Sequence, residues 1–61
     1  MNYFYILETE DGEIRYFATE DGAKEAQRWW AETYYKDFNF DRPEKVIEVG
    51  LARIRKAKLE D

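Results

Sequence analysis

The sequence predicts an α+β domain of ββαβ order, in which a three-stranded antiparallel sheet packs on one helix. Three observations predict it: a hairpin signal at Asp11-Gly12, one long segment of helical periodicity at residues 20–35, and a β-prone segment after that helix. A hairpin and one helix need a third strand for stability. Because the helix returns the chain, that strand would run antiparallel to the first, giving the strand order 2-1-3. With 61 residues, we expect one small domain.

The first two strands are predicted at about residues 2–8 and 14–18, which are rich in aromatic residues and isoleucine. Asp11-Gly12 suits the two central positions of a type I′ turn between them. A two-residue loop of this kind would place Thr9 opposite Ile14 and fix the pairing of the residues before and after them.

This register predicts two different sheet faces, because side chains alternate along a strand. One face would hold Phe4, Ile6, Glu8, Arg15 and Phe17. We expect the helix on this face, because aromatic rings without hydroxyl groups form the drier core. The other face would hold Tyr3, Tyr5, Leu7, Ile14, Tyr16 and Ala18.

The tyrosine-rich face has no obvious cover in the sequence, since one helix covers one side of a sheet. The connector or the C-terminal tail could fold over it, or the two faces could be reversed. The third interpretation is a partner surface, for which tyrosine is suited because it combines a large contact area with a polar tip.

The helix is predicted at about residues 20–35, with Thr19 as its N-cap. Glu20 and Asp21 follow where the helix dipole favours negative charge. The residues expected to face the sheet recur at helical spacing, with Gln27 at their edge. They are Ala23, Ala26, Trp30 and Tyr34.

Trp29 and Tyr35 are predicted at the flanks of this helix, since neighbouring helical residues point about 100° apart. Trp30 and Trp29 therefore cannot both point into one core. Trp29 either covers a sheet edge or the loop of residues 37–43, or it belongs to a contact surface.

Residues 36–43 are expected to connect the helix to the third strand, with Phe38, Phe40 or both docked on the helix end. The third strand is predicted at about residues 46–55, because the segment is rich in β-branched residues and then alternates. A change of phase near Gly50 indicates a bulge.

A helical alternative for residues 44–58 stays open, because Asp41-x-x-Glu44 resembles a capping box and Ile47, Leu51 and Ile54 have helical spacing. Residues 56–61 are expected to form a frayed tail.

The residue types argue against catalysis, and we expect no enzyme, no cofactor and no metal site. The chain has no cysteine, no histidine and no serine, and its three glycines are isolated. It therefore lacks a thiolate nucleophile, the usual general base near neutral pH and a glycine-rich phosphate loop. We interpret its clustered acidic residues as a solvated rim and not as a cation-binding site.

Charge is distributed unevenly along the chain. Residues 1–25 carry seven acids and two bases, giving −5, whereas residues 26–61 carry seven acids and eight bases, giving +1. The apolar start lacks a basic leader and a cleavage site, and no run is long enough for a membrane span. We therefore expect a cytoplasmic protein.

The predicted function is non-catalytic protein binding, most concretely as a small acidic inhibitor or adaptor of a larger protein, such as one that handles nucleic acid. Small size, acidity, lack of cysteine and an aromatic surplus are shared with virus-encoded inhibitors, including anti-CRISPR proteins. This likeness is one of type and assigns no residues. The candidate partner-binding residues are Tyr3, Tyr5, Leu7, Tyr16, Trp29, Tyr35, Asp11 and Glu13.

Two alternatives remain. Single-stranded nucleic acid could bind the tyrosine face, because rings among cations hold single strands. The cations expected there are Arg53, Arg55, Lys56 and Lys58. The other alternative is a structural homodimer in which two tyrosine faces cover each other.

Overall fold

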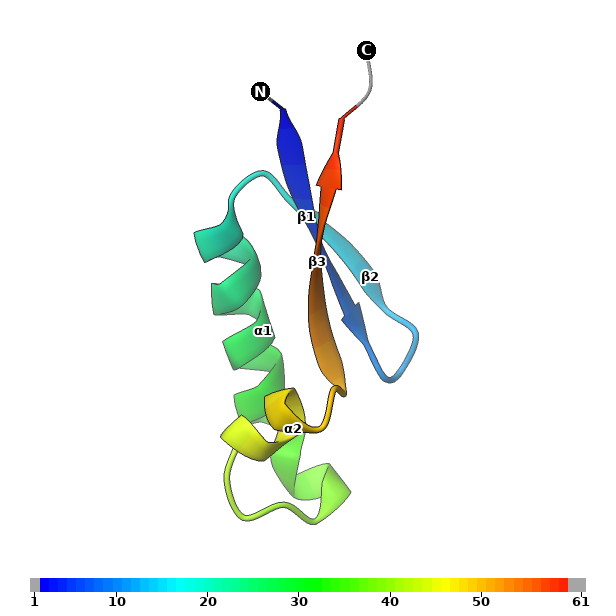
Figure 1. Ribbon diagram of the computed structural model, residues 1–61. Coiled ribbons are helices and arrows are strands. Elements are labelled where there is room, and N and C mark those ends of the chain that lie inside the picture. The colour runs from blue at the N-terminus through cyan, green and yellow to red at the C-terminus, as the bar shows by residue number, and fades with distance from the viewer. Residues whose placement is uncertain (1, 60–61) are drawn as a thin grey trace.

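The computed structural model describes residues 2–59. Its elements are β1 (Tyr3–Thr9), β2 (Ile14–Phe17), α1 (Glu20–Tyr34), the 3-10 helix η1 (Tyr35–Phe38), α2 (Glu44–Glu48) and β3 (Ala52–Lys58). The sheet has the order β2-β1-β3 with both pairs antiparallel, and α1 packs along one of its faces (Figure 1). The predicted α+β class and strand order are confirmed.

The hairpin loop between β1 and β2 has three residues, Glu10 to Gly12, instead of the two that were predicted. The N–H of Gly12 donates to the carbonyl of Thr9 at 3.0 Å, and the N–H of Thr9 donates to the carbonyl of Glu13 at 3.1 Å. Gly12 is left-handed, with φ at 90°. A three-residue hairpin loop commonly ends in a left-handed glycine of this kind. The predicted type I′ turn is therefore wrong.

The longer loop shifts the pairing of the two strands by one residue. Ile14 lies opposite Glu8 rather than Thr9, and Tyr16 lies opposite Ile6 rather than Leu7. A shift of one residue moves every side chain of one strand to the other face, because the side-chain period is two. Tyr16 therefore leaves the face on which it was predicted beside Leu7.

Helix α1 packs on the Leu7 face of the sheet, so the predicted assignment of Phe4 and Ile6 to the helix is wrong. Leu7 is 1% exposed and belongs to the buried cluster with Trp30 of α1. Register places Ile54 opposite Leu7, and Ile54 packs against the same cluster. On the other face of the sheet, the residues of β3 opposite β1 include Arg53 and Arg55, whose guanidinium groups remain in water. The helix therefore covers the side where Leu7 of β1, Phe17 of β2 and Ile54 of β3 meet in one core cluster.

The start of α1 follows the prediction. The N–H of Gly22 donates to the side-chain oxygen of Thr19 at 3.1 Å, which confirms the N-cap. Ala23 and Trp30 are buried, as the helical spacing predicted. The side-chain amide of Gln27 donates to the carbonyl of Ala52 at 2.8 Å and ties the helix to the start of β3.

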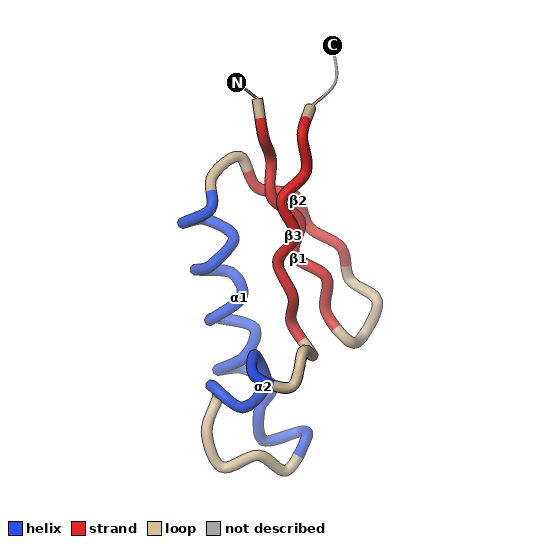
Figure 2. Tube along the Cα trace, viewed as in Figure 1, coloured by secondary structure: helices blue, strands red, loops and turns tan. Residues whose placement is uncertain are grey.

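Residues 44–48 form α2 rather than the start of the third strand (Figure 2). Val46 of α2 is fully buried in the cluster that also contains Ala31. A short helix thus lines the end of α1 that the sheet does not reach. The predicted capping box is absent from this segment, because Pro43 occupies the N-cap position and no side chain caps the helix.

A Schellman motif ends α2 and corrects the predicted bulge at Gly50. The N–H of Leu51 donates to the carbonyl of Val46 at 3.0 Å, and that of Gly50 donates to Ile47 at 3.1 Å. Gly50 is left-handed with φ at 85°. Both bonds and the glycine are those of this helix-ending motif.

Strand β3 starts and ends later than the predicted 46–55. It pairs with β1 over seven positions, from Ala52 opposite Thr9 to Lys58 opposite Tyr3. The predicted tail at residues 56–61 is therefore wrong for Lys56–Lys58, whereas residues 60–61 lie outside the described part. The long β1–β3 ladder is favoured because it completes the backbone hydrogen bonds of the central strand.

The connector docks on the core as predicted, since Phe38 and Phe40 both pack against the buried cluster. The ring centroids of Phe38 and Trp30 lie 6.1 Å apart. Between residues 2 and 59, none of the helices has the length and apolar character needed to cross a membrane.

Replacing Leu7 and Tyr16 by alanine in turn tests the observed sheet faces. We expect Leu7→Ala to lower the free energy of unfolding by about 2–5 kcal/mol, because it opens a cavity in the core. Tyr16→Ala should cost less than about 1 kcal/mol, since it removes one cross-strand contact at the surface. Urea unfolding followed by circular dichroism measures both. Equal losses would contradict the observed register.

Candidate partner-binding site

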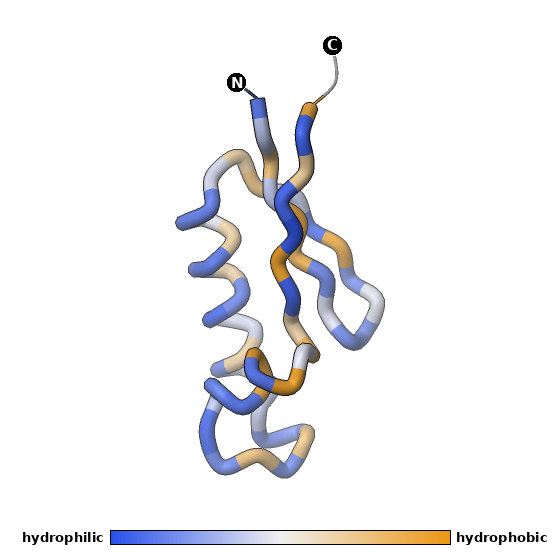
Figure 3. The backbone as a smooth tube through the Cα atoms, in the orientation of Figure 1, coloured by the Kyte–Doolittle hydropathy of each residue, from blue (hydrophilic) through white to orange (hydrophobic). Residues whose placement is uncertain are grey.

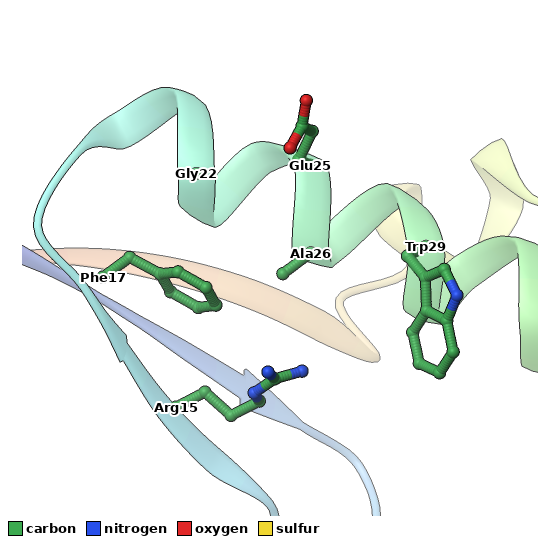
Figure 4. Close-up of a pocket in the computed structure, with 6 residues that line it drawn as sticks. All are labelled: Arg15, Phe17, Gly22, Glu25, Ala26 and Trp29. Carbon is green, nitrogen blue, oxygen red and sulfur yellow. The ribbon is translucent and has the colours of Figure 1, made fainter.

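A groove of about 550 Å³ lies between α1 and β2, on the face of the sheet that carries the helix. We call it the α1–β2 groove. Its lining comes from the second strand and from one side of α1 between Gly22 and Trp29 (Figure 4). The residues are Arg15, Phe17, Gly22, Glu25, Ala26 and Trp29.

Trp29 forms the end wall of this groove and is 57% exposed. Its neighbour Trp30 points into the core and is 4% exposed. The 100° step between neighbouring helical residues separates the two indoles. The indole ring of Trp29 is thus mostly exposed to solvent beside β2 and is not covered by packing over the sheet edge. Its partner-binding role stays a prediction.

The strand side of the groove combines an apolar ring with a cation. Arg15 and Phe17 project from β2 into the same space (Figure 4), and the Arg15 guanidinium lies 5.6 Å from the centroid of the Phe17 ring. Glu25 points away from β2 in this view. The groove can therefore hold an apolar side chain, while Arg15 offers a donor at its rim.

Asp11 helps to build the hairpin turn. Its carboxylate accepts a hydrogen bond from the hydroxyl of Thr9 and one from the N–H of Glu13 at 3.2 Å. The Thr9 hydroxyl first, and the Glu13 N–H second, lower the pKa of Asp11 below its ordinary value of 3.8, because both stabilise the charged form. Asp11 is thus a turn residue as well as a predicted contact residue.

The formal net charge of the chain lies in one segment. Residues 10–25 carry six acids and two bases, which gives −4, the value for the whole chain. This segment contains the turn, β2 and the first half of α1. In Figure 3 the hydrophilic residues mark both the turn and the first turns of the helix.

These acids form two groups along the chain. Glu10, Asp11 and Glu13 precede β2, whereas Glu20 and Asp21 follow it. The four residues of β2 separate the groups by roughly 13 Å, at about 3.3 Å per residue. Negative charge therefore stands at both ends of the strand that borders the groove.

The sheet face away from α1, here called the distal face, carries a smaller apolar surface. Tyr16 is 68% exposed there and its ring lies 6.0 Å from that of Phe4. Ile6 is only 6% exposed, because Tyr16 and Arg55 flank it across the two ladders. A hollow of about 290 Å³ lies at one end of this surface. Its lining is Phe4, Tyr16, Phe17, Ala18 and Leu59.

The predicted tyrosine face does not exist as one surface. Leu7 is buried in the core, and Tyr16 lies on the distal face. Tyr3 and Tyr5 share the α1 side of the sheet, where the Lys56 ammonium lies 4.2 Å from the centroid of the Tyr3 ring. The one-residue register shift is the physical reason for this dispersal.

Tyr35 sits apart from these residues, at the end of α1. It is half-buried and packs against the core cluster, with the Lys36 ammonium 5.8 Å from its ring centroid. Of the predicted contact residues, Trp29 alone lines the α1–β2 groove, while Asp11 and Glu13 lie in the turn before β2.

The four basic residues predicted to bind nucleic acid divide between the two faces of β3. Arg53 and Arg55 lie on the distal face, and Arg55 pairs with Glu8 at 3.5 Å. Lys56 and Lys58 lie on the α1 side with Tyr3 and Tyr5. The predicted placement of the arginines beside Tyr3 and Tyr5 is therefore wrong, because the register sets them opposite Glu8 and Ile6.

Sequence reasoning missed five residues of the groove, although part of the signal was present. Gly22, Ala26 and Trp29 recur at helical spacing on one side of α1. Arg15 and Phe17 were predicted on the face that carries the helix and lie there, but residue spacing does not show which turns of the helix lie beside them.

Among residues 2–59, no three His, Cys, Asp or Glu side chains are grouped so that they could hold a metal ion. Comparison of the chain with protein-family models, curated proteins and solved structures finds no match. The groove, its charge and its exposed tryptophan therefore carry the functional argument.

The hydrogen bond between Thr9 and Asp11 makes the stability of the turn pH-dependent. Because the pKa of Asp11 is lowered from 3.8 in the folded protein, its contribution is complete well above pH 3.8 and is lost as pH falls through the folded pKa. Carboxyl NMR titration should give a midpoint below 3.8 for Asp11. Thr9→Val removes the hydroxyl donor and should raise that midpoint. An unchanged midpoint in Thr9→Val would refute the assigned cause.

Proposed function

We propose that the protein is a non-catalytic protein-binding module, which acts as a small acidic inhibitor or adaptor on a basic surface of a larger protein. The observation that carries this proposal is an exposed Trp29 at the end of a groove whose other lining comes mainly from residues 10–25, the segment with a net charge of −4. Tryptophan is the residue type most enriched at the energetic centre of protein interfaces.

Charge and ring have separate roles in this proposal. Acids at the rim of an interface mainly accelerate and orient association with a positive surface. A large ring that leaves water on binding supplies the affinity that screened charges do not. We expect such a protein to act in the cytoplasm on a partner whose basic surface handles nucleic acid.

Direct binding of single-stranded nucleic acid is the second candidate function. The distal face carries Tyr16 and Phe4 together with Arg53 and Arg55. Stacking on such rings among cations holds single strands. The pairing of Arg55 with Glu8 and the net charge of −4 oppose it, because binding to phosphates is driven by positive potential.

Loss of Trp29 should abolish partner capture without unfolding the protein. We expect the immobilised chain to capture a basic partner from extracts of its host, and Trp29→Ala to reduce capture at least tenfold, a typical effect of a central interface residue. Val49→Ala is the matched control, since Val49 is 49% exposed at the C-cap of α2 and does not line the groove. Quantitative mass spectrometry of the captured protein is the measurement. Equal losses in both variants would contradict the proposal.

Charge reversal near β2 should weaken capture more than the same reversal elsewhere. The test variant is Glu13→Lys with Glu25→Lys, which leaves the turn residue Asp11 intact. The control is Asp37→Lys with Asp41→Lys, which changes net charge equally at exposed positions beyond α1. We expect only the first pair to slow association, and added salt to reduce the difference.

Labelled single-stranded DNA and RNA should not bind the protein at low salt. Fluorescence anisotropy is the measurement, with Arg53→Glu plus Arg55→Glu as the variant that removes the cations of the distal face. Micromolar binding that this variant abolishes would replace the protein-binding proposal by the nucleic-acid one.

A further inference from the structure

The outer edge of β2 is available for a further strand. Within residues 2–59, β2 pairs with β1 alone and ends the sheet on its side (Figure 1). The bond from the Thr9 N–H to the Glu13 carbonyl identifies these two as a hydrogen-bonded pair. Since such pairs alternate along an antiparallel ladder, Arg15 and Phe17 direct their backbone groups to β1. Ile14 and Tyr16 then direct theirs away from the sheet.

The two edges of the sheet differ in how they discourage pairing. β3 carries four bases among its seven residues, a pattern that protects an edge strand against association. β2 carries one base among four residues, together with Ile14, Tyr16 and Phe17. The edge of β2 is thus the less protected of the two, and it borders the α1–β2 groove.

The groove lies where side chains of an added strand would point. Alternate residues of a strand beside β2 would project to the α1 side, next to Phe17 and toward Trp29. The absence of a side chain at Gly22 and the short one at Ala26 leave this space of about 550 Å³ beside the helix. It suits one large apolar side chain, because two rings and an alanine methyl line it, while the charged groups of Arg15 and Glu25 can stay at its rim.

The charge around β2 selects the chemistry of the added strand. Acids lie before the strand, at the turn, and after it, at the start of α1. An extended segment with lysine or arginine on both sides of an apolar residue matches this arrangement. A second copy of the chain does not, because antiparallel pairing of two β2 strands brings acidic ends together. The same acids repel nucleic acid.

We propose that an extended basic segment of a partner protein pairs with β2 as a fourth strand and places a large apolar side chain in the α1–β2 groove against Phe17 and Trp29. This inference rests on the proposed protein-binding function and specifies its site. Backbone hydrogen bonds to Ile14 and Tyr16 supply affinity, and the groove supplies specificity, as in other cases of strand addition.

The experiment uses a library of random ten-residue peptides displayed on phage and selected against the full chain. We expect selected peptides to carry a large apolar residue between lysines or arginines, and to lack proline at the centre. The strongest peptide is then synthesised and titrated by calorimetry and NMR. In the native protein, the amides of Ile14 and Tyr16 should become protected from hydrogen exchange when this peptide binds.

Tyr16→Pro removes the outward N–H while leaving the ladder to β1 intact, because proline is tolerated at an outward edge position. This substitution should weaken peptide binding at least about tenfold, because one hydrogen bond is lost and the proline ring obstructs the added strand. The matched control Tyr16→Ala, which keeps the N–H, should change binding by less than about threefold. Trp29→Ala should weaken binding about tenfold or more, and Val49→Ala should leave it unchanged.

Three outcomes would overturn the inference. The first is a peptide whose binding perturbs the distal face around Ile6 and Arg53, which would leave the protein-binding function standing at another site. The second is self-association that protects the same β2 amides without peptide. The third is the absence of any peptide that binds with a Kd below about 100 μM, which is already weak binding. The partner-capture experiment would then still test the proposed function separately.

Discussion

The turn between β1 and β2 sets the register of the hairpin and, with it, the faces of the sheet. Asp11 accepts from Thr9 and from Glu13, and Gly12 takes the left-handed conformation that closes a three-residue loop. This loop length sets which residues of the two strands face each other. Since a shift of one residue exchanges the faces of a strand, one carboxylate and one glycine decide which side chains of β2 reach the helix.

The core that results is small and asymmetric. Leu7, Trp30 and Val46 form its centre, at the end of the molecule where α2 meets α1. Figure 1 shows α2 beside the later turns of α1 and the start of β3. The first half of α1 has only the sheet beneath it, and there the groove remains beside β2. A chain of 61 residues therefore completes its core at one end and leaves Trp29 exposed along the flank.

The surface chemistry follows the same asymmetry. The net charge lies along the turn, β2 and the start of α1, whereas the bases of β3 occupy the opposite edge of the sheet. Charged side chains on β3 discourage pairing there, so the two edges are not equivalent. An acidic, aromatic-lined edge is suited to a basic extended partner, as the proposed inhibitor or adaptor function requires.

Residue chemistry and spacing were enough to predict the elements whose signals are local. The cap at Thr19, the stripe through Ala23 and Trp30, and the strand order 2-1-3 follow from hydrogen-bonding chemistry, helical period and chain direction. Tertiary structure alone decided the loop length, the packed face and the end of the helical segment at Gly50. The loop length depends on side-chain hydrogen bonds within the turn. Which sheet face packs on the helix depends on which residues of the three strands can be buried together. Each of these outcomes depends on the relative free energies of whole arrangements of the chain. Residue periodicity carries no information about those free energies.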